Sequence, residues 1–540
     1  MEQNMDNIQL VVLMAGRAKR LQPLSYGLPK GLESFMQIPL LYEMIIPFIN
    51  KGLKDITLVV SPSDKQLVQM FLDKAFSTIK FNIVVQDEPK GPLNAFQQIK
   101  NVTKETLLLL GDTKCETDID FSKSFIGYSE VPDWERWCLL NVDEDGVING
   151  FVDKPKTKPN TNKAVIGLYF FKNFALLNKL LKKDYPLLHG EYQLSSLLNE
   201  YIANEKTFAY KFYQWKDSGT LKSFVEEKRK SLTGRLFNSF EISNNAVITK
   251  SSDFDGLKRE AYWYENIIKT PLAVYVPQYF NYNVNGDKMK YQIEFLPYKT
   301  LAEYFVFYPI IDENWEFIFN ELLDVLKDFW NYKEFKCNIN IKDSCKRMYL
   351  DKTIDRLKSW DRQDLLNMDK LIINGKTHLG YKKLLEALMP KIEKIINNSD
   401  EYLGVIHGDA SFQNILYHPN ISHFKLIDPR GAFPDESMFG DIRYEVAKLR
   451  HCYHGLYDYI IYDMFDVKQN ENIFTYSFLT ENFVNYNIFD KIVKERGFDI
   501  DEIKLIEGLL FLSMIPFHKD KPSNQLMFFL IGIQCLNELV

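Results

Sequence analysis

Short apolar runs alternate with amphipathic stretches along the first part of the chain. Residues 8–14 are almost entirely apolar, which predicts a buried strand. Residues 41–50 place apolar side chains at helical spacing, and residues 56–60 form a second apolar, β-branched run. This order of strand, loop, helix and strand is typical of an α/β fold with parallel strands.

The pattern changes near residue 232. A polar, basic stretch at 228–235 contains a glycine, and short apolar strands follow it. Later, residues 349–396 and 488–540 have helical apolar periodicity. We expect three regions: a first domain at 1–232, then a small strand-rich lobe at 233–300 and a helical lobe at 301–540 of a second domain.

Composition and charge narrow the possible functions. A chain of 540 residues exceeds one hydrophobic core, and 66 basic against 72 acidic residues give a net charge of −6. This balance disfavours nucleic acid and anionic lipid as partners. The first apolar segment is too short for export or for a membrane span, so we expect a cytoplasmic protein. The cysteines lack a CxxC pair and are expected to be reduced thiols: Cys115, Cys138, Cys337, Cys345, Cys452 and Cys535.

The end of the first strand has the chemistry of a phosphate site. The strand leads into Ala15 and Gly16, and a glycine turn after a strand offers free backbone N–H groups to phosphates. Arg20 and Lys30 follow and supply positive charge. These features predict a nucleotide-binding loop.

This block resembles the sugar-phosphate and phosphocholine nucleotidyltransferases, whose first loop has a glycine-rich turn, an arginine and then Pro-Lys. The resemblance implies a Rossmann-like domain with a mixed sheet. It also implies base recognition by Gln86 and Gly91 and metal binding by Asp112 and Asp217. Acceptor-pocket positions that it implies are Lys154, Gly167 and Glu191.

The chemistry of nucleotidyl transfer explains these residue types. A phosphate oxygen of the acceptor attacks the α-phosphorus of a nucleoside triphosphate and pyrophosphate leaves, so charge on oxygen must be neutralised. Asp112 and Asp217 would hold Mg²⁺ for this step, and Lys154 would orient the acceptor. Ala18 departs from the family, which usually has a second glycine there, and its methyl group restricts positive φ.

A second set of residues, far downstream, indicates phosphoryl transfer. Asp409 lies two residues after His407, Asn414 follows five residues later, and Asp428 ends the next apolar run. In such a catalytic loop the first Asp takes the proton of an attacking hydroxyl, and the Asn and the second Asp hold the Mg²⁺ of ATP.

Lys250 and Glu260 have the spacing of the lysine and helix glutamate that position the phosphates of ATP, with Glu265 as an alternative partner. No GxGxxG turn precedes Lys250, where the chain has Ser243–Asn245. The His407-Gly408-Asp409 triplet resembles the aminoglycoside phosphotransferase and choline kinase superfamily. The resemblance implies a bilobal, protein-kinase-like α+β domain acting on a small molecule.

The residues after Asp428 bear on the acceptor of this second site. Choline kinases usually continue with an acidic and aromatic segment, whereas this chain has Pro429 and Arg430. An arginine there would repel a cation. Two interpretations stay open: Arg430 and Arg443 pair with Glu445 or Asp435, or they contact an anionic or polyhydroxyl acceptor. Asp441 is expected to cap or brace the next helix.

The two halves are chemically consecutive, because a kinase makes the phosphomonoester that a nucleotidyltransferase consumes. We expect a bifunctional enzyme that uses Mg²⁺ at both sites, ATP for the first step and CTP for the second, and a small alcohol or sugar as acceptor. The resemblance implies a role in decorating surface polysaccharide, such as capsule, or lipid. Two alternatives remain: a sugar kinase fused to a sugar-1-phosphate nucleotidyltransferase, or one catalytic half with a nucleotide-binding regulatory half. The oligomeric state stays open.

Overall fold

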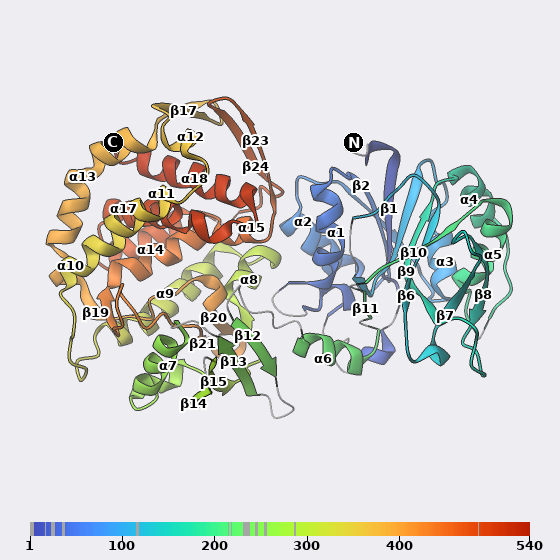
Figure 1. The fold of residues 1–540 in the computed structure, drawn as a ribbon, viewed down its shortest axis with the longest axis horizontal. Coiled ribbons are helices and arrows are strands. Elements are labelled where there is room, and N and C mark those ends of the chain that lie inside the picture. Colours follow the sequence, from blue (N-terminus) through green and yellow to red (C-terminus); the bar gives the residue numbers. More distant parts are fainter. Residues whose placement is uncertain are drawn as a thin grey trace. The chain divides into compact units, whose positions relative to one another are not determined.

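The structure is a computed structural model in which the chain divides into two compact units, Met1–Ser231 and Leu232–Val540 (Figure 1). Cys115, the turn at Ser243–Asn245 and the expected boundary at residue 232 lie outside the described residues. The described residues are 5–16, 18–22, 28–34, 38–114, 118–188, 190–213, 215–217, 219–230, 238–242, 247–252, 256–285, 288–483 and 485–540.

The first unit is built on a mixed sheet with the central strand order β10-β6-β9-β4-β1-β2-β3. β1 pairs in parallel with β2 and β4, whereas β9 runs antiparallel to β4 and β6. The hairpin β7–β8 joins this sheet through β9. The main strands are β1 Ile8–Leu13, β2 Asp55–Val60, β3 Phe81–Val85, β4 Glu105–Leu110, β6 Phe125–Glu130, β7 Cys138–Val142, β8 Ile148–Asp153, β9 Lys163–Phe171 and β10 Phe208–Lys211.

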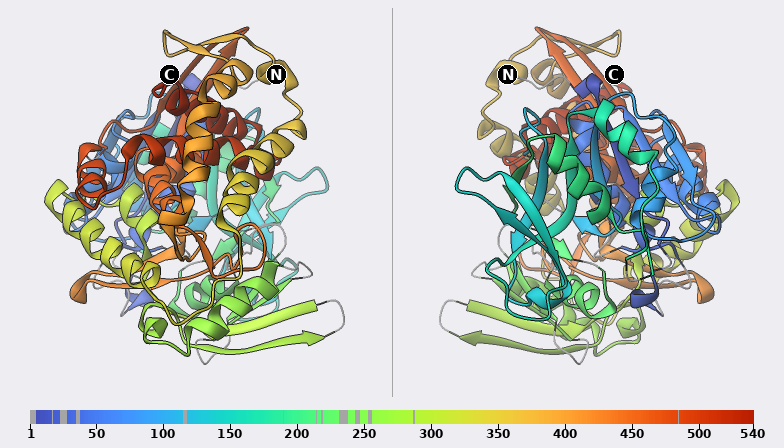
Figure 2. Two further views of the ribbon diagram at one scale, coloured as in Figure 1. Left: turned by 90° about the vertical axis from the view of Figure 1, so that its left-hand side faces the viewer. Right: turned by 90° about the vertical axis from the view of Figure 1, so that its right-hand side faces the viewer.

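Helices cover both faces of this sheet, with α1 and α2 on one side and α3, α4 and α5 on the other (Figures 1 and 2). All six residues of β1 are buried, as a central parallel strand requires. The predicted strands at 8–14 and 56–60 and the helix at 41–50 are confirmed, and so is the α/β class of this unit. The helices are α1 Leu40–Asn50, α2 Lys65–Ala75, α3 Pro92–Gln97, α4 Phe174–Leu181, α5 Leu194–Asn204 and α6 Leu221–Lys230.

The second unit begins with an antiparallel sheet in the order β12-β13-β15-β14, against which α7 packs. β19 and the hairpin β20–β21 then frame a loop at residues 406–414. The elements are β12 Asn238–Ile242, β13 Val247–Ser252, α7 Gly256–Ile267, β14 Tyr279–Asn285, β15 Lys288–Glu294, β16 Lys299–Thr300, β19 Leu403–Val405, β20 Ile415–His418, β21 His423–Leu426 and β22 Phe439–Asp441.

Helices make up most of the rest of this unit (Figure 1). α17 is buried along almost its whole length and packs against α14 and α18, so it forms the centre of the helical core. The helices are α8 Leu301–Phe307, α9 Asp312–Trp330, α10 Ile341–Lys346, α11 Lys352–Lys358, α12 Gln363–Leu366, α13 Tyr381–Asn397, α14 Ile442–Tyr453, α15 Tyr457–Ile461, α16 Asn487–Glu495, α17 Ile500–Met514 and α18 Pro522–Asn537.

The prediction that residues 349–396 are helical is wrong in one segment. β17 Lys370–Ile373 and β18 Lys376–Leu379 form a hairpin that joins β24 Ile473–Phe478 and β23 Phe465–Asn470 in a four-stranded sheet. The turn is Asn374–Gly375, with φ of +47° and +80°. An Asn-Gly pair between short apolar runs favours a tight hairpin, and this signal outweighs the helical periodicity around it.

Among the described helices, none combines the length and the apolar character that crossing a bilayer requires. The five cysteines that the structure describes are free, and none of them forms a disulfide.

Candidate functional sites

The loop after β1 meets the loop after β4, because the two strands run in parallel with Leu13 opposite Leu110. The N–H of Gly111 donates to the carbonyl of Leu13 at 2.9 Å, which fixes this contact. Ala15 is buried and Gly16 has open space where a side chain would project. The carboxyl ends of two central parallel strands therefore form the floor of the first candidate site.

An ion pair joins the two loops. The Nζ of Lys30 lies 2.8 Å from Oδ2 of Asp112, and both side chains are partly exposed. Burial alone would raise the pKa of Asp112, but the charges of Lys30 and Arg20 outweigh it and hold that pKa below its usual value. Arg20, Lys30 and Asp112 thus lie together, with the carboxylate ionised.

Asp217 reaches the same place through a short two-stranded sheet. β11 Lys216–Asp217 pairs with β5 Thr113–Lys114, and the backbone of Asp217 lies opposite Thr113, the residue after Asp112. The backbone of Asp217 thus lies near the end of β4 that carries Asp112, and Mg²⁺ takes carboxylate oxygens together with phosphate and water. No cluster of three or more metal-binding side chains occurs among the described residues. A Mg²⁺ here would complete its coordination from the triphosphate and water.

Ala18 adopts the left-handed conformation, with φ of +44°. A glycine would take this conformation without strain, whereas alanine loses roughly 1 kcal/mol or more there. Ala18 therefore adopts the left-handed backbone conformation that a glycine at this position would favour.

Gln86 and Gly91 lie beside Glu191. A side chain at Gly91, where φ is +111°, would come within 2.8 Å of the backbone of Tyr192 and 3.0 Å of Cβ of Glu191. The amide of Gln86 donates to the carbonyl of Gly91 at 3.3 Å and to Oδ1 of Asn94 at 2.9 Å. Gln86 is thus buried and holds this loop in place.

Gly167 supports the floor of the site from behind. Its φ is +84°, and a side chain there would lie 2.6 Å from Oγ1 of Thr113. That hydroxyl donates to the carbonyl of Ile166 at 2.6 Å. Gly167 therefore lets β9 approach β5, which begins directly after Asp112 and pairs with β11. Lys154 follows β8 directly and is exposed, and its backbone N–H donates to the carbonyl of Trp137 at 2.9 Å.

Replacing Gly167 by alanine is expected to lower the free energy of unfolding of this unit by about 2 kcal/mol, because left-handed strain adds to the clash with Thr113. Denaturation followed by circular dichroism measures the change. Gly150→Ala is the matched control, since its new methyl group would have no neighbour closer than 3.9 Å. Equal stability of the two variants would contradict this packing.

The first unit is similar to known proteins. Residues 9–234 match the family described as nucleotidyl transferase. The first unit is a nucleotidyltransferase domain. It is 28% identical over 235 residues to the glucose-1-phosphate thymidylyltransferase of Mycolicibacterium smegmatis, covering 40% of this chain and 79% of that protein.

A second relative is the bifunctional protein GlmU of Methanococcus vannielii, 26% identical over 255 residues. The match covers 44% of this chain and 60% of the length of that protein. Among solved structures, the UDP-glucose pyrophosphorylase from Acinetobacter baumanii is 19% identical, with a TM-score of 0.36 over 41% of this chain and 91% of that chain.

The second unit lies beyond the nucleotidyltransferase domain and has its own polar constellation. The Nζ of Lys250 on β13 lies 2.5 Å from Oε2 of Glu260 on α7 and 3.3 Å from Oδ1 of Asp428. Glu265 instead accepts a hydrogen bond from Tyr279, so Glu260 is the partner of Lys250. Burial would lower the pKa of Lys250, but the two carboxylates outweigh it and raise that pKa.

Asp409, Asn414 and Asp428 surround one loop. The amide of Asn414 donates to the backbone carbonyl of Asp409 at 2.9 Å and to its Oδ2 at 3.1 Å, which leaves the amide oxygen of Asn414 as an acceptor. The N–H of Ile427 donates to the carbonyl of Asn414 at 2.9 Å, so Asp428 follows directly beside it. One amide oxygen and one carboxylate fit a Mg²⁺ that takes its other ligands from phosphates.

Sequence reasoning missed the residue that supports this loop. Oε1 of Glu445 accepts the N–H groups of His407 and Gly408 at 2.7 and 3.0 Å, and Oε2 accepts the indole N–H of Trp330 at 2.7 Å. Burial raises the pKa of Glu445 to about 7, although these three donors lower it. Burial also lowers the pKa of His407 to about 4, so His407 is a neutral, structural residue. No short motif marks Glu445, which lies 37 positions after Gly408.

Glu445→Gln is expected to destabilise the second unit by about 2 kcal/mol, because the new NH₂ group must face one of three buried N–H donors. The 406–414 loop should lose its fixed position at the same time. Thermal unfolding measures the loss, and Glu401→Gln at an exposed site is the control. Equal unfolding temperatures would show that Glu445 does not hold the loop.

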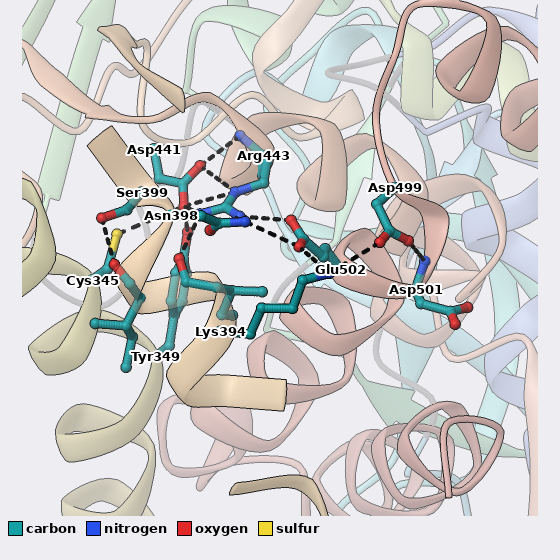
Figure 3. A network of polar contacts seen from close by, with 12 residues as sticks. Cys345, Tyr349, Lys394, Asn398, Ser399, Asp441, Arg443, Asp499, Asp501 and Glu502 are labelled. Atoms are coloured by element: carbon teal, nitrogen blue, oxygen red, sulfur yellow. Dashed lines mark hydrogen bonds and ion pairs between the residues drawn. The ribbon is translucent and has the colours of Figure 1, made fainter. Parts of the chain in front are cut away.

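Of the two arginines that the sequence left open, Arg443 is structural. It donates to Oδ2 of Asp441 at 2.7 Å and to Oε2 of Glu502 at 2.6 Å, within the buried network of Figure 3. Asp441 caps α14 by accepting the N–H of Arg443, which confirms the predicted cap. The expectation that Arg443 pairs with Glu445 or Asp435, or reaches an acceptor, is therefore wrong.

Arg430 also pairs with neither predicted carboxylate. Its guanidinium donates to the hydroxyl of Tyr444 at 3.2 Å, while Asp435 pairs with Arg347 at 2.7 Å. Glu445 is occupied by the loop that it supports. Arg430 thus lies beside the 406–414 loop without a carboxylate partner among the described residues.

Proposed function

We propose that the chain is a bifunctional enzyme. Its second unit phosphorylates a small alcohol with ATP, and its nucleotidyltransferase domain couples the phosphomonoester to a nucleotide, with CTP as first choice. The observation that carries the first step is the joint placement of Lys250, Glu260 and Asp428 on one side and Asp409 with Asn414 on the other. The proposed regions are 1–232 for nucleotidyl transfer, 233–300 for the small lobe and 301–540 for the helical lobe.

In the first step, the hydroxyl oxygen of the acceptor attacks the γ-phosphorus of ATP. The bond from that phosphorus to the β-phosphate oxygen breaks, ADP leaves, and Asp409 takes the hydroxyl proton. Lys250, aligned by Glu260, neutralises the phosphates of ATP. A Mg²⁺ held by Asn414 and Asp428 would supply further charge neutralisation.

In the second step, an oxygen of the new phosphomonoester attacks the α-phosphorus of the nucleoside triphosphate. The bond between the α- and β-phosphates breaks and pyrophosphate leaves. Arg20 and Lys30 bind the triphosphate, with Ala15 and Gly16 offering backbone contacts, and Gln86 and Gly91 shape the base site. Lys154, Gly167 and Glu191 form the acceptor side, while Asp112 and Asp217 would hold a Mg²⁺ that neutralises charge on the phosphates. The activated product would serve surface polysaccharide or lipid modification.

A second candidate function is a sugar kinase joined to a sugar-1-phosphate nucleotidyltransferase. The names of the relatives, a glucose-1-phosphate thymidylyltransferase and GlmU, favour it. One product screen separates the two: the full chain receives ATP, each of CTP, UTP, dTTP and GTP, and a panel of alcohols and sugars. Mass spectrometry is expected to show a CDP-activated alcohol. A sugar nucleotide as the main product would favour the second candidate, and no nucleotide-activated product would contradict both.

A further inference from the structure

Four cationic side chains gather around the 406–414 loop of the second unit, and we call them the cationic cluster. One of them, Lys448, pairs with the proposed base, because its Nζ lies 2.8 Å from Oδ1 of Asp409. Among the described residues the other three make no ion pair with a carboxylate. The cluster consists of Lys352 and Arg356 on α11, Arg430 after Asp428, and Lys448 on α14.

Arg430 is held against the loop that carries Asp409. Its backbone N–H donates to the carbonyl of His407 at 2.9 Å, and a Cβ built at Gly408 would lie 2.9 Å from Cβ of Arg430. Its guanidinium donates to the hydroxyl of Tyr444 at 3.2 Å. The ring of Tyr444 packs in turn on Tyr349 at 6.4 Å between centroids. These contacts direct Arg430 toward the start of α11, which follows Tyr349 closely.

Lys352 and Arg356 extend the cluster from α11. The Nζ of Lys352 meets only the weak acceptor Sδ of Met348, at 3.4 Å, among the hydrogen bonds of the described residues. Arg356 donates to the carbonyl of Ser513 at 3.0 Å and covers the ring of Phe517 at 4.2 Å. Neither of these two contacts supplies Arg356 with a negatively charged partner.

The charges of these side chains act on one another. Burial, together with the charges of Arg430, Arg356 and Lys448, holds the pKa of Lys352 well below its usual value. Burial and Arg430 lower the pKa of Arg356 to about 10. Like charges in a partly buried place are costly unless an anion joins them. Asp409 pairs with Lys448 and also acts on Lys352, whereas Arg430 and Arg356 make no ion pair with a carboxylate among the described residues, so the cluster favours binding of an anion.

We propose that the alcohol phosphorylated at Asp409 carries an anionic group, a carboxylate or a phosphate, which Arg430, Lys352 and Arg356 bind. This inference rests on the proposed kinase function of the second unit and specifies its substrate class. Guanidinium groups bind carboxylates and phosphates through paired hydrogen bonds, and an ammonium adds a point charge. A quaternary ammonium alcohol would meet repulsion at the same place.

Calorimetric titration of the full chain, saturated with ADP and Mg²⁺, tests the proposal with four probes: D-glycerate, glycerol 3-phosphate, glycerol and choline. At least one of the two anionic alcohols is expected to bind tenfold or more tightly than glycerol and choline. D-Glycerate and glycerol 3-phosphate separate a carboxylate site from a phosphate site. Preferred binding of glycerol or choline, or equal binding of all four, would overturn the proposal.

Two variants assign the binding to the cluster. Arg430→Gln and Lys352→Met are each expected to weaken the anionic alcohol tenfold or more and to leave ADP binding unchanged. Lys358→Gln, an exposed lysine on the same helix that pairs with Asp355, is the matched control and should change neither. Anion binding that survives both variants would overturn the proposal. A loss of ADP binding in a folded variant would do the same, because the cations would then belong to the nucleotide.

The release of ADP from ATP separates this inference from the proposed function. Phosphorylation of glycerol or choline that is insensitive to Arg430→Gln would leave the kinase standing and refute the anionic acceptor. Anion binding that follows the two variants, without ADP release for any probe, would support the anion site and refute the kinase function.

Discussion

Asp409→Asn is expected to lower ADP release by about 10³-fold, because a general base contributes typically 10²- to 10⁴-fold and the amide cannot take the proton of the acceptor. The variant should fold, because asparagine has nearly the same size as aspartate and its amide oxygen can still accept a hydrogen bond from either Lys448 or Asn414. Pyrophosphate release from a supplied phosphomonoester and CTP should stay unchanged. Coupled assays for ADP and pyrophosphate on the same preparation measure both activities.

Asp369→Asn is the control for this variant, because Asp369 is 75% exposed and pairs with Lys383 on the surface. It should leave ADP release unchanged. If Asp409→Asn retained full ADP release, Asp409 would not be the base. If it abolished both activities, the two halves would not act as separate catalysts.

Asp112→Asn is expected to lower pyrophosphate release by about 10²- to 10³-fold, the range seen when one group that stabilises transition-state charge is removed. The change removes the charge of a proposed metal ligand and leaves Lys30 without its ionic partner at 2.8 Å. ADP release from ATP and the alcohol should continue. The result would separate two catalytic halves from one catalytic half with a regulatory partner.

The pH dependence of the free energy of unfolding tests the ionised state of Asp112 independently of activity. Its folded-state pKa lies below the usual value, so its contribution to stability is present above that usual value and is lost as the pH falls through the folded pKa. Asp133→Asn is the control, because Asp133 is half-exposed and its partners are close in sequence: Arg136 at 2.8 Å and the indole N–H of Trp137 at 3.3 Å. Unchanged pyrophosphate release in Asp112→Asn would remove Asp112 from the active site.

Local sequence patterns predicted the residues that lie on loops after strands. The order of apolar runs gave the central strands of the first unit, and the spacing of Lys250 and Glu260 anticipated their ion pair at 2.5 Å. The strands were predictable because a parallel strand buried on both faces is almost entirely apolar. Lys250 lies within β13 and Glu260 within α7, which packs against the same sheet, so their side chains meet. The backbone of Asp217 lies opposite Thr113 in the short sheet of β5 and β11, and its proposed role stays a prediction.

Other residues depend on packing between distant segments, which no local pattern encodes. Glu445 acts on the 406–414 loop from α14, and Lys352 approaches Arg430 from α11. For Arg443 the sequence left open a carboxylate partner or an acceptor contact, and the structure shows it 1% exposed and paired with Asp441 and Glu502. Asn374–Gly375 is a sequence signal for the β17–β18 hairpin, but the helical periodicity of the residues around it favoured a helix.

The central claim is that one chain performs two consecutive steps on the same phosphate. ATP labelled with ¹⁸O in its γ-phosphoryl group tests this directly when it is incubated with the full chain, Mg²⁺, the alcohol panel and, in separate reactions, CTP, UTP, dTTP or GTP. Mass spectrometry is expected to find the label in the activated alcohol, in the phosphate attached to the alcohol, and absent from the released pyrophosphate. An activated product without label, or labelled phosphomonoester that never becomes activated with any of the four nucleoside triphosphates, would contradict the account.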